Sequence, residues 1–176
     1  SSSSITPASV SIRALVMVAR AKLEFRETAS MTDLSTARVG LIGGSGLYAI
    51  PGLQDVQELS VETPFGPTSD RLLLGRLAGM EVVFLARHGR HHHLLPREVP
   101  YRANIWAMRS MNVRWLISVS AVGSLQEKLR PRDMVIPDQF IDRTQQRPQT
   151  FFGEGCVAHV SLAEPFCCKL SALLAD

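Results

Sequence analysis

Short apolar runs separated by turn residues dominate the chain from position 38 onward. Three such runs lie in its first half, at 39–42, 71–77 and 80–86, and each has the length and composition of a β-strand. Ala78-Gly79 separates the second run from the third and is typical of a tight turn. The pattern therefore predicts one isolated strand and, after it, a β-hairpin.

The second half of the chain mixes helical and strand-like spacing. Within 99–112, apolar residues recur at the period of one helix face, at Tyr101, Ile105, Met108 and Met111. The runs at 115–125 and 133–142 predict two further strands, and Pro137 interrupts the second. Strands that alternate with a helix, together with a hairpin, predict an α/β fold with a mixed central β-sheet flanked by helices.

The two ends of the chain differ from its middle. Residues 1–37 open with four serines and carry several arginines but few acids, as a transit peptide does. Alternatively, Met31 is the true start and the preceding residues are a misread leader. We therefore expect 1–37 to be a non-homologous or disordered leader and 38–176 to form one domain. Because 165–176 begin a helical pattern and then stop, we expect this domain to be incomplete at its C-terminus.

Composition and charge argue against several classes of protein. The net charge of +3 comes from 19 basic and 16 acidic residues without a basic stripe, so no nucleic-acid partner is expected. No apolar run approaches the roughly 20 residues of a membrane span, so no membrane partner is expected either. The odd number of cysteines, 3 in all, favours reduced thiols in a cytoplasmic protein. The location would be organellar if 1–37 is a transit peptide.

A cluster of basic residues directly follows the apolar run that ends at position 86. It admits a metal site, a basic surface loop or an anion pocket, and it comprises Arg87, His88, Arg90, His91, His92 and His93. The arginines would repel a divalent cation, and the first acidic residue after the cluster is Glu98. Arginine instead offers phosphate a planar fork of donors, at a strand end where α/β proteins place their sites. An anion pocket is therefore favoured, with a solvated basic loop as the alternative.

Two further turns carry hydrogen-bond donors. The strand at 39–42 runs into residues 44–46, whose backbone N–H groups and Ser45 hydroxyl suit an oxyanion; a glycine turn without a ligand is the alternative. Ser118 and Ser120 interrupt the apolar run at 115–125. A buried hydroxyl needs a partner, which is either the protein's own backbone or a ligand.

Seven blocks of the chain, in order and at natural spacing, resemble one family, the S-methyl-5'-thioadenosine phosphorylases among the trimeric purine nucleoside phosphorylases. The blocks cover roughly residues 39–168 and read GLIGGSGL, TPFGPTSD, FLARHGRHHHLLP, YRANIWAM, SAVGSL, PDQFIDRTQQRPQTFF and AEPFC. The glycine block is shared with the wider superfamily, whereas TPFG..SD, ARHGR.H and DQFIDRT are more particular to this family. The resemblance implies a nucleoside phosphorylase-like fold, truncated at the C-terminus.

The resemblance also implies roles for individual residues. Four would form a phosphate cradle: Ser45, Arg87, His88 and Ser120. Three would serve the nucleoside: Ala121 against it, His92 near the cradle, and His159 lent to a neighbouring subunit's pocket. His91 and His93 are expected to be loop residues.

The reaction that the resemblance implies is phosphorolysis. Phosphate would attack the anomeric carbon of S-methyl-5'-thioadenosine and displace adenine, giving S-methyl-5-thioribose 1-phosphate for purine and methionine salvage. Inorganic phosphate is then a co-substrate, and no metal or cofactor is expected. The family's purine-protonating aspartate would lie beyond Asp176, so the chain alone is expected to be inactive and its full-length form to be a homotrimer. Phosphorolysis of methylthioinosine or of inosine and guanosine, or a non-catalytic phosphate-binding fragment, are the alternatives.

Overall fold

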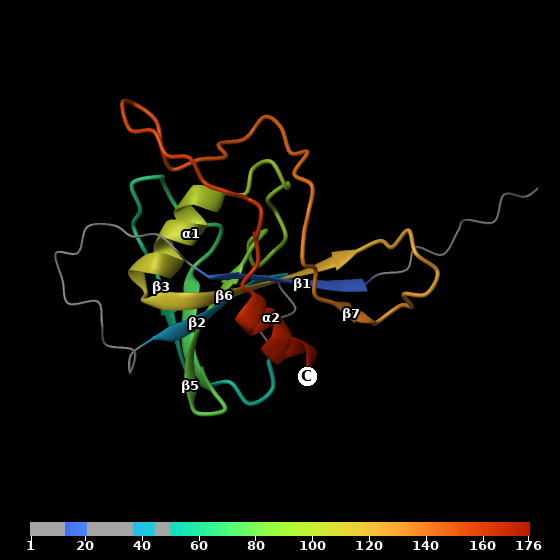
Figure 1. The fold of residues 1–176 in the computed structure, drawn as a ribbon. Helices are drawn as coiled ribbons and strands as arrows, with labels where there is room; N and C mark the ends of the chain where they lie inside the picture. The colour runs from blue at the N-terminus through green and yellow to red at the C-terminus, as the bar shows by residue number, and fades with distance from the viewer. Residues whose placement is uncertain (1–12, 21–36, 45–49) are drawn as a thin grey trace, which may run out of the picture.

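The computed structural model describes residues 13–20, 37–44 and 50–176, with the backbone alone for 13–20. Their strands form one mixed seven-stranded sheet in the order β3-β4-β5-β2-β6-β1-β7 (Figure 1). The predicted α/β class with a mixed central sheet is confirmed. The elements are β1 (Arg13–Arg20), β2 (Arg38–Gly43), β3 (Gln54–Leu59), β4 (Leu72–Leu77), β5 (Met80–Ala86), α1 (Tyr101–Ser110), β6 (Val113–Val122), β7 (Met134–Val135) and α2 (Cys168–Ala175).

The predicted hairpin is formed by β4 and β5. The two strands pair antiparallel, with Leu77 opposite Met80, so that two residues make the turn. Both turn residues have positive φ, +48° at Ala78 and +80° at Gly79. A turn of this kind matches the twist of the strands that it joins, and glycine adopts it without strain.

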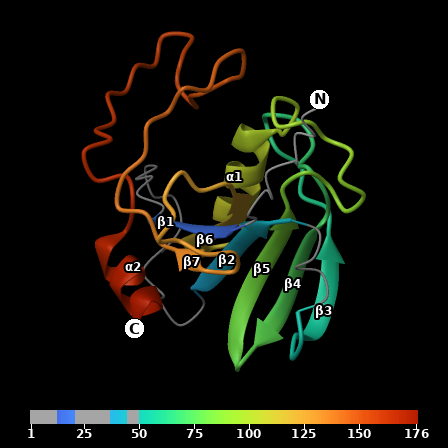
Figure 2. The same cartoon turned by 90° about the vertical axis from the view of Figure 1, so that its right-hand side faces the viewer.

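Three parallel strands make the centre of the sheet. β2 pairs in parallel with β5 on one side and with β6 on the other; Leu41 lies opposite both Phe84 and Ile117. The chain therefore leaves β2, builds β3 to β5 on one side, and then passes through α1 to β6 on the other side (Figure 2).

The core lies where α1 packs on the sheet. Alternate residues of β5 share a face of the sheet, and Val83 and Leu85 are fully buried in this core. The buried residues of α1 are Ala103, Asn104, Ala107 and Met108. The helix is confirmed, but its buried face is shifted from the predicted one, because small alanines allow a close approach to the sheet while Ile105 and Met111 pack at the edge of the core.

Two strands were not predicted. β3 is almost entirely exposed and carries the polar sequence QDVQEL, so it lacks an apolar run and forms by pairing with β4. β1 lies within the expected leader; it pairs antiparallel with β6, from Arg13 opposite Val122 to Arg20 opposite Trp115. Residues 1–12 and 21–36 of that leader lie outside the described residues.

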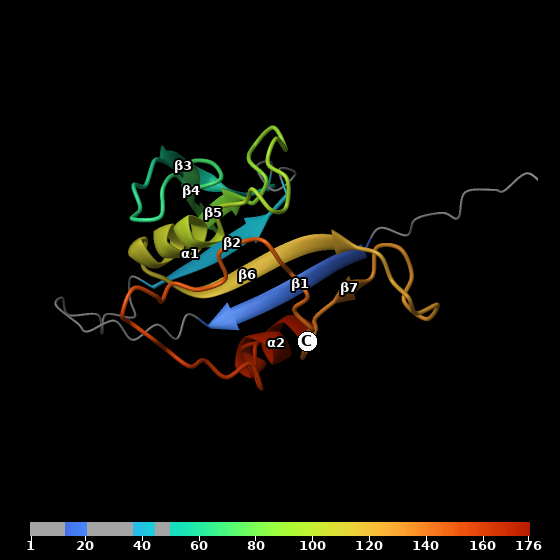
Figure 3. The same ribbon diagram turned by 90° about the horizontal axis from the view of Figure 1, so that it is seen from above.

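The strand predicted at 133–142 is reduced to the two residues of β7, since Pro137 cannot donate to a sheet. After β7 a long segment without regular structure passes alongside α1 before the chain enters α2 (Figure 3). Arg102 of α1 holds this segment by donating to the Thr150 carbonyl over 3.5 Å. Phe151 also packs edge-on against Phe65, with ring centroids 5.3 Å apart.

The helix that begins in 165–176 is confirmed as α2. It spans 8 residues, and α1 spans 10. Neither of these helices, the two in the described part of the chain, has the length and apolar character needed to cross a membrane.

Candidate functional site

Three parallel strands run side by side to one edge of the sheet, where β2 and β5 end and β6 continues to Val122. β2 ends at Gly43 opposite Ala86 of β5, and Ile42 lies opposite Ser118 of β6. The Arg87 N–H donates to the Gly43 carbonyl over 2.9 Å and extends the β2–β5 pairing by one residue. Because the chain changes sides of the sheet at β2, this edge is a topological switch point, where open α/β sheets hold their ligands.

The Arg87 side chain bridges the loop after β5 and the end of β6. Its Nη1 donates to Ser120 Oγ over 2.5 Å, and its Nε donates to His88 Nε2 over 3.2 Å. All three side chains are half-buried. A hydroxyl that accepts from arginine keeps its own proton for another acceptor, and the guanidinium has further N–H groups. Arg87 and Ser120 therefore offer N–H and O–H donors side by side at this edge of the sheet.

The orientation of His88 follows from its two hydrogen bonds. Its Nδ1 lies 2.8 Å from the Leu94 carbonyl, which can only accept, so Nδ1 carries the proton. Its Nε2 then accepts from Arg87. The hydrogen-bond network thus assigns a neutral imidazole whose Nε2 faces Arg87. The Leu94 carbonyl thus sets the ring orientation through Nδ1, and Nε2 stays directed at Arg87.

The remaining histidines of the basic cluster play different parts. His92 stacks on His88, with ring centroids 4.7 Å apart and an interplanar angle of 26°, and its side chain is exposed. The His93 ring lies against Gly89, where any Cβ would overlap it, and Gly89 has φ +76°. Glycine is therefore required at this point of the turn. His92 thus lies beside the Arg87–His88 pair through its ring stacking on His88, and its part in binding the nucleoside stays a prediction.

The other predicted site residues are not joined to this group. Ser45 lies outside the described residues; Gly44, which precedes it, is exposed at the same edge of the sheet. Ala121 is exposed and follows Ser120 on β6. His159 is exposed in the segment between β7 and α2, and within the described residues no hydrogen bond or ring contact connects it with Arg87.

The segment at 138–144, part of the PDQFIDRTQQRPQTFF block, forms its own local structure. Asp142 accepts from the Thr144 hydroxyl over 2.6 Å and from the Thr144 N–H over 2.9 Å. These two hydrogen bonds lower the pKa of Asp142 below its usual value. The carboxylate therefore stabilises a turn, and it does not point to an acid–base role.

Chemically, the site suits an anion. Its charged group is the Arg87 guanidinium, supported by a hydroxyl and an imidazole, and arginine binds tetrahedral oxyanions through paired N–H donors. In the described part of the chain, no three His, Cys, Asp or Glu side chains are placed to hold a metal ion.

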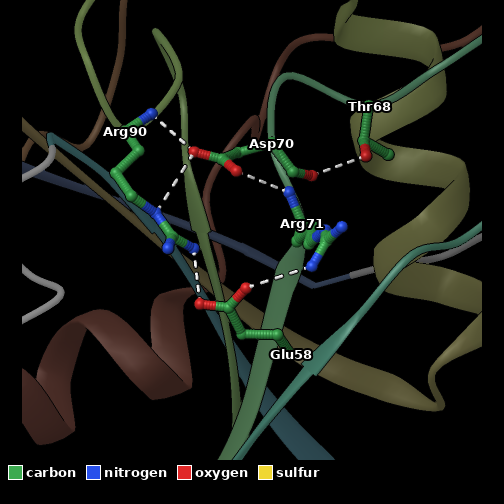
Figure 4. A network of polar contacts seen from close by, with 5 residues as sticks. All are labelled: Glu58, Thr68, Asp70, Arg71 and Arg90. Carbon is green, nitrogen blue, oxygen red and sulfur yellow. Dashed lines mark hydrogen bonds and ion pairs between the residues drawn. The ribbon is translucent and has the colours of Figure 1, made fainter.

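A network of charged residues, not predicted from the sequence, supports the turn that carries Arg87 (Figure 4). The Asp70 carboxylate accepts from the Arg90 N–H over 2.5 Å, while Arg90 Nη2 lies 2.8 Å from Glu58. Asp70 belongs to the TPFGPTSD block, one of the seven blocks that carry the family resemblance. That block was the one signal that could have pointed to Asp70.

Comparisons with known proteins agree with this picture. Residues 38–176 match the family model described as the Phosphorylase superfamily. The chain is 66% identical over 143 residues to an S-methyl-5'-thioadenosine phosphorylase of Prochlorococcus marinus, covering 81% of this chain and 46% of that protein. It is 58% identical over 141 residues to the enzyme of the same name from Thermosynechococcus vestitus, covering 80% and 49%.

Solved structures of similar proteins share the fold. A methylthioadenosine phosphorylase from an antarctic soil metagenomic library is 55% identical and superposes with a TM-score of 0.76, covering 79% of this chain and 48% of that one. The methylthioadenosine phosphorylase from Schistosoma mansoni, in complex with adenine, is 38% identical, with a TM-score of 0.71, covering 79% and 52%. The chain spans about half the length of the relatives that it matches.

Proposed function

Because the chain belongs to the Phosphorylase superfamily, we propose that residues 38–176 supply the phosphate-binding half of an S-methyl-5'-thioadenosine phosphorylase. The observation that carries the proposal is the meeting of Arg87, His88 and Ser120 at the switch point of the sheet. The names of the relatives support the substrate.

In the proposed reaction, an oxygen of inorganic phosphate attacks the anomeric carbon of the nucleoside. The bond from that carbon to the purine nitrogen breaks, and the purine leaves with the electron pair and gains a proton. The sugar acquires cationic character in the transition state, so a dianion held beneath it both stabilises charge and supplies the nucleophile. No metal or cofactor is part of this proposal.

Arg87 would bind phosphate through its N–H groups, and Ser120 would donate the proton that its contact with Arg87 leaves available. An arriving oxyanion would compete with His88 Nε2 for the Arg87 Nε–H. Since the Leu94 carbonyl fixes the ring from the other side, His88 stays against the site during this exchange. Ser45 on the glycine loop would add a further hydroxyl. The purine would be protonated by a residue beyond Asp176.

The proposal extends to assembly and location. His159 is flanked by exposed apolar side chains, Val157 at 78% and Val160 at 72% of full exposure, which suits a subunit interface. This supports a homotrimer in which His159 serves a neighbouring subunit's pocket. The free cysteines Cys156, Cys167 and Cys168 suit the reducing cytoplasm.

The decisive experiment measures release of free base from competing nucleosides. It uses a full-length form, meaning either a protein of the relatives' length that contains this chain, or residues 38–176 joined to the remaining half of the Prochlorococcus marinus relative. We expect phosphate-dependent release of adenine from S-methyl-5'-thioadenosine in preference to cleavage of methylthioinosine or inosine, and no release by the 176-residue chain alone. Phosphate-independent release, or preference for a 6-oxo purine, would contradict the proposal.

A further inference from the structure

Three backbone hydrogen bonds close the turn after β5. Gly89 N–H donates to Ala86, His92 N–H donates to Gly89, and Leu94 N–H donates to His88, all within the turn. The Arg90 N–H differs, because it donates to the Asp70 carboxylate, 20 residues earlier in the chain, over 2.5 Å. The conformation of the turn therefore depends on a side chain from another loop.

Asp70 is itself firmly placed. Its neighbour Ser69 shares two hydrogen bonds with Asn104 of α1: Ser69 N–H donates to Oδ1 over 2.9 Å, and Asn104 Nδ2 donates to Ser69 Oγ over 2.6 Å. Both residues are buried, at 6% and 2% exposure. The Arg71 N–H holds the other oxygen of the Asp70 carboxylate over 2.8 Å. A buried helix contact thus fixes the acceptor that the turn uses.

The same network directs the second arginine of the turn away from the site. Arg90 Nη2 lies 2.8 Å from Glu58 Oε1, and Arg90 Nε lies 3.9 Å from Asp70 (Figure 4). Two carboxylates therefore face this guanidinium. The positive charge left to face an anion is that of Arg87, three residues earlier.

We propose that Asp70 is a positioning residue for phosphate: it pins the Arg90 N–H and thereby fixes the turn from which Arg87 and His88 reach the site. The Arg87 main chain is held from one side by its bond to Gly43, and Asp70 holds the turn from the other side. This inference rests on the proposed function. It assigns Asp70 no contact with phosphate.

The direction in which the phosphate KM changes when Asp70 is removed distinguishes a positioning role from a simple effect of its charge. By charge alone, a carboxylate near an anion site weakens anion binding, so its removal should lower the KM for phosphate. Positioning predicts the opposite, since small displacements of binding groups are costly in an oriented site. We expect D70A to raise the phosphate KM about tenfold in the full-length form, with the nucleoside KM and the kcat at saturating phosphate nearly unchanged. D70N, whose amide oxygen still accepts from Arg90 N–H, should restore much of the loss.

The control variant is E58Q. It weakens the ion pair at the Arg90 guanidinium and leaves the hydrogen bond from the Arg90 N–H to Asp70 intact. Its phosphate KM should stay close to that of the unaltered protein. If the unaltered form phosphorolyses the nucleoside but D70A keeps its phosphate KM, or changes both KM values equally, the inference is wrong and the proposed function stands. If the unaltered form shows no phosphate-dependent cleavage, both are overturned together.

Discussion

Arg87 and Ser120 lie 33 residues apart in the sequence, and their side chains meet over 2.5 Å. The contact joins the loop after β5 to the end of β6 across the intervening strand β2. It brings a permanent positive charge and a hydroxyl to one point at the carboxyl edge of the sheet, which is the basis of the proposed phosphate site.

Replacing Arg87 should weaken phosphate binding selectively. A hydrogen bond from a charged donor contributes about 1.5–3 kcal/mol, so R87A should raise the phosphate KM of the full-length form about tenfold to a hundredfold. R87K keeps the charge but loses the fork of donors, so its phosphate KM should lie between those of the unaltered protein and R87A. Initial rates at varied phosphate and saturating nucleoside measure the effect. The exposed Arg97 provides the control variant, R97A, and an equal change in R97A would contradict the assignment.

Ser120 should tolerate threonine but not alanine. S120T keeps the hydroxyl that accepts from Arg87, whereas S120A removes both that acceptor and the proton offered to phosphate. We expect S120A to raise the phosphate KM about tenfold, since a hydrogen bond contributes about 0.5–1.5 kcal/mol and the Arg87 contact is disturbed as well. S120T should stay close to the unaltered enzyme in the same titration. Equal losses in both variants would show that side-chain volume, and not the hydroxyl, matters there.

The buried pair Ser69–Asn104 should contribute measurably to stability. N104A leaves the Ser69 N–H without its acceptor, and an unsatisfied buried polar group costs about 1–3 kcal/mol. Urea unfolding of the 176-residue chain should detect this loss. A double-mutant cycle with S69A isolates the contact between the two side chains, and S60A, at an exposed serine, is the control. Additive losses from S69A and N104A would contradict the coupling.

The sequence predicts those elements of the fold whose apolar residues recur at a regular spacing. The β4–β5 hairpin and helix α1 were predicted because their spacing follows a regular period. β3 was missed because it is an exposed edge strand held by β4. β1 was missed because a pairing with β6 leaves no signature in a segment with the composition of a leader.

Some residues of the candidate site could likewise be predicted from the sequence, and others could not. Arg87 and His88 follow an apolar run and Ser120 interrupts one, so all three could be singled out from the sequence, and the structure brings them together. Asp70 could not be found in this way, because one hydrogen bond to an amide 20 residues later has no periodic pattern. Ser45 lies outside the described residues, and its part in the cradle stays a prediction.

The ion pair at the opposite end of the central strands should make stability depend on pH. Arg38 Nε donates to Glu81 over 2.8 Å, and this hydrogen bond and the positive charge of Arg38 lower the Glu81 pKa from its ordinary value of 4.5. A carboxyl with a lowered pKa in the folded state adds stability above its ordinary pKa. That contribution is lost as the pH falls through the lowered value. Urea unfolding of the chain and of E81Q should therefore differ near neutral pH and converge once the pH has fallen below the lowered Glu81 pKa. The difference should be small, because the pair is only half-buried and is screened by solvent. A gap between the two proteins that stays constant into acid would show that Glu81 acts through packing and not through its charge.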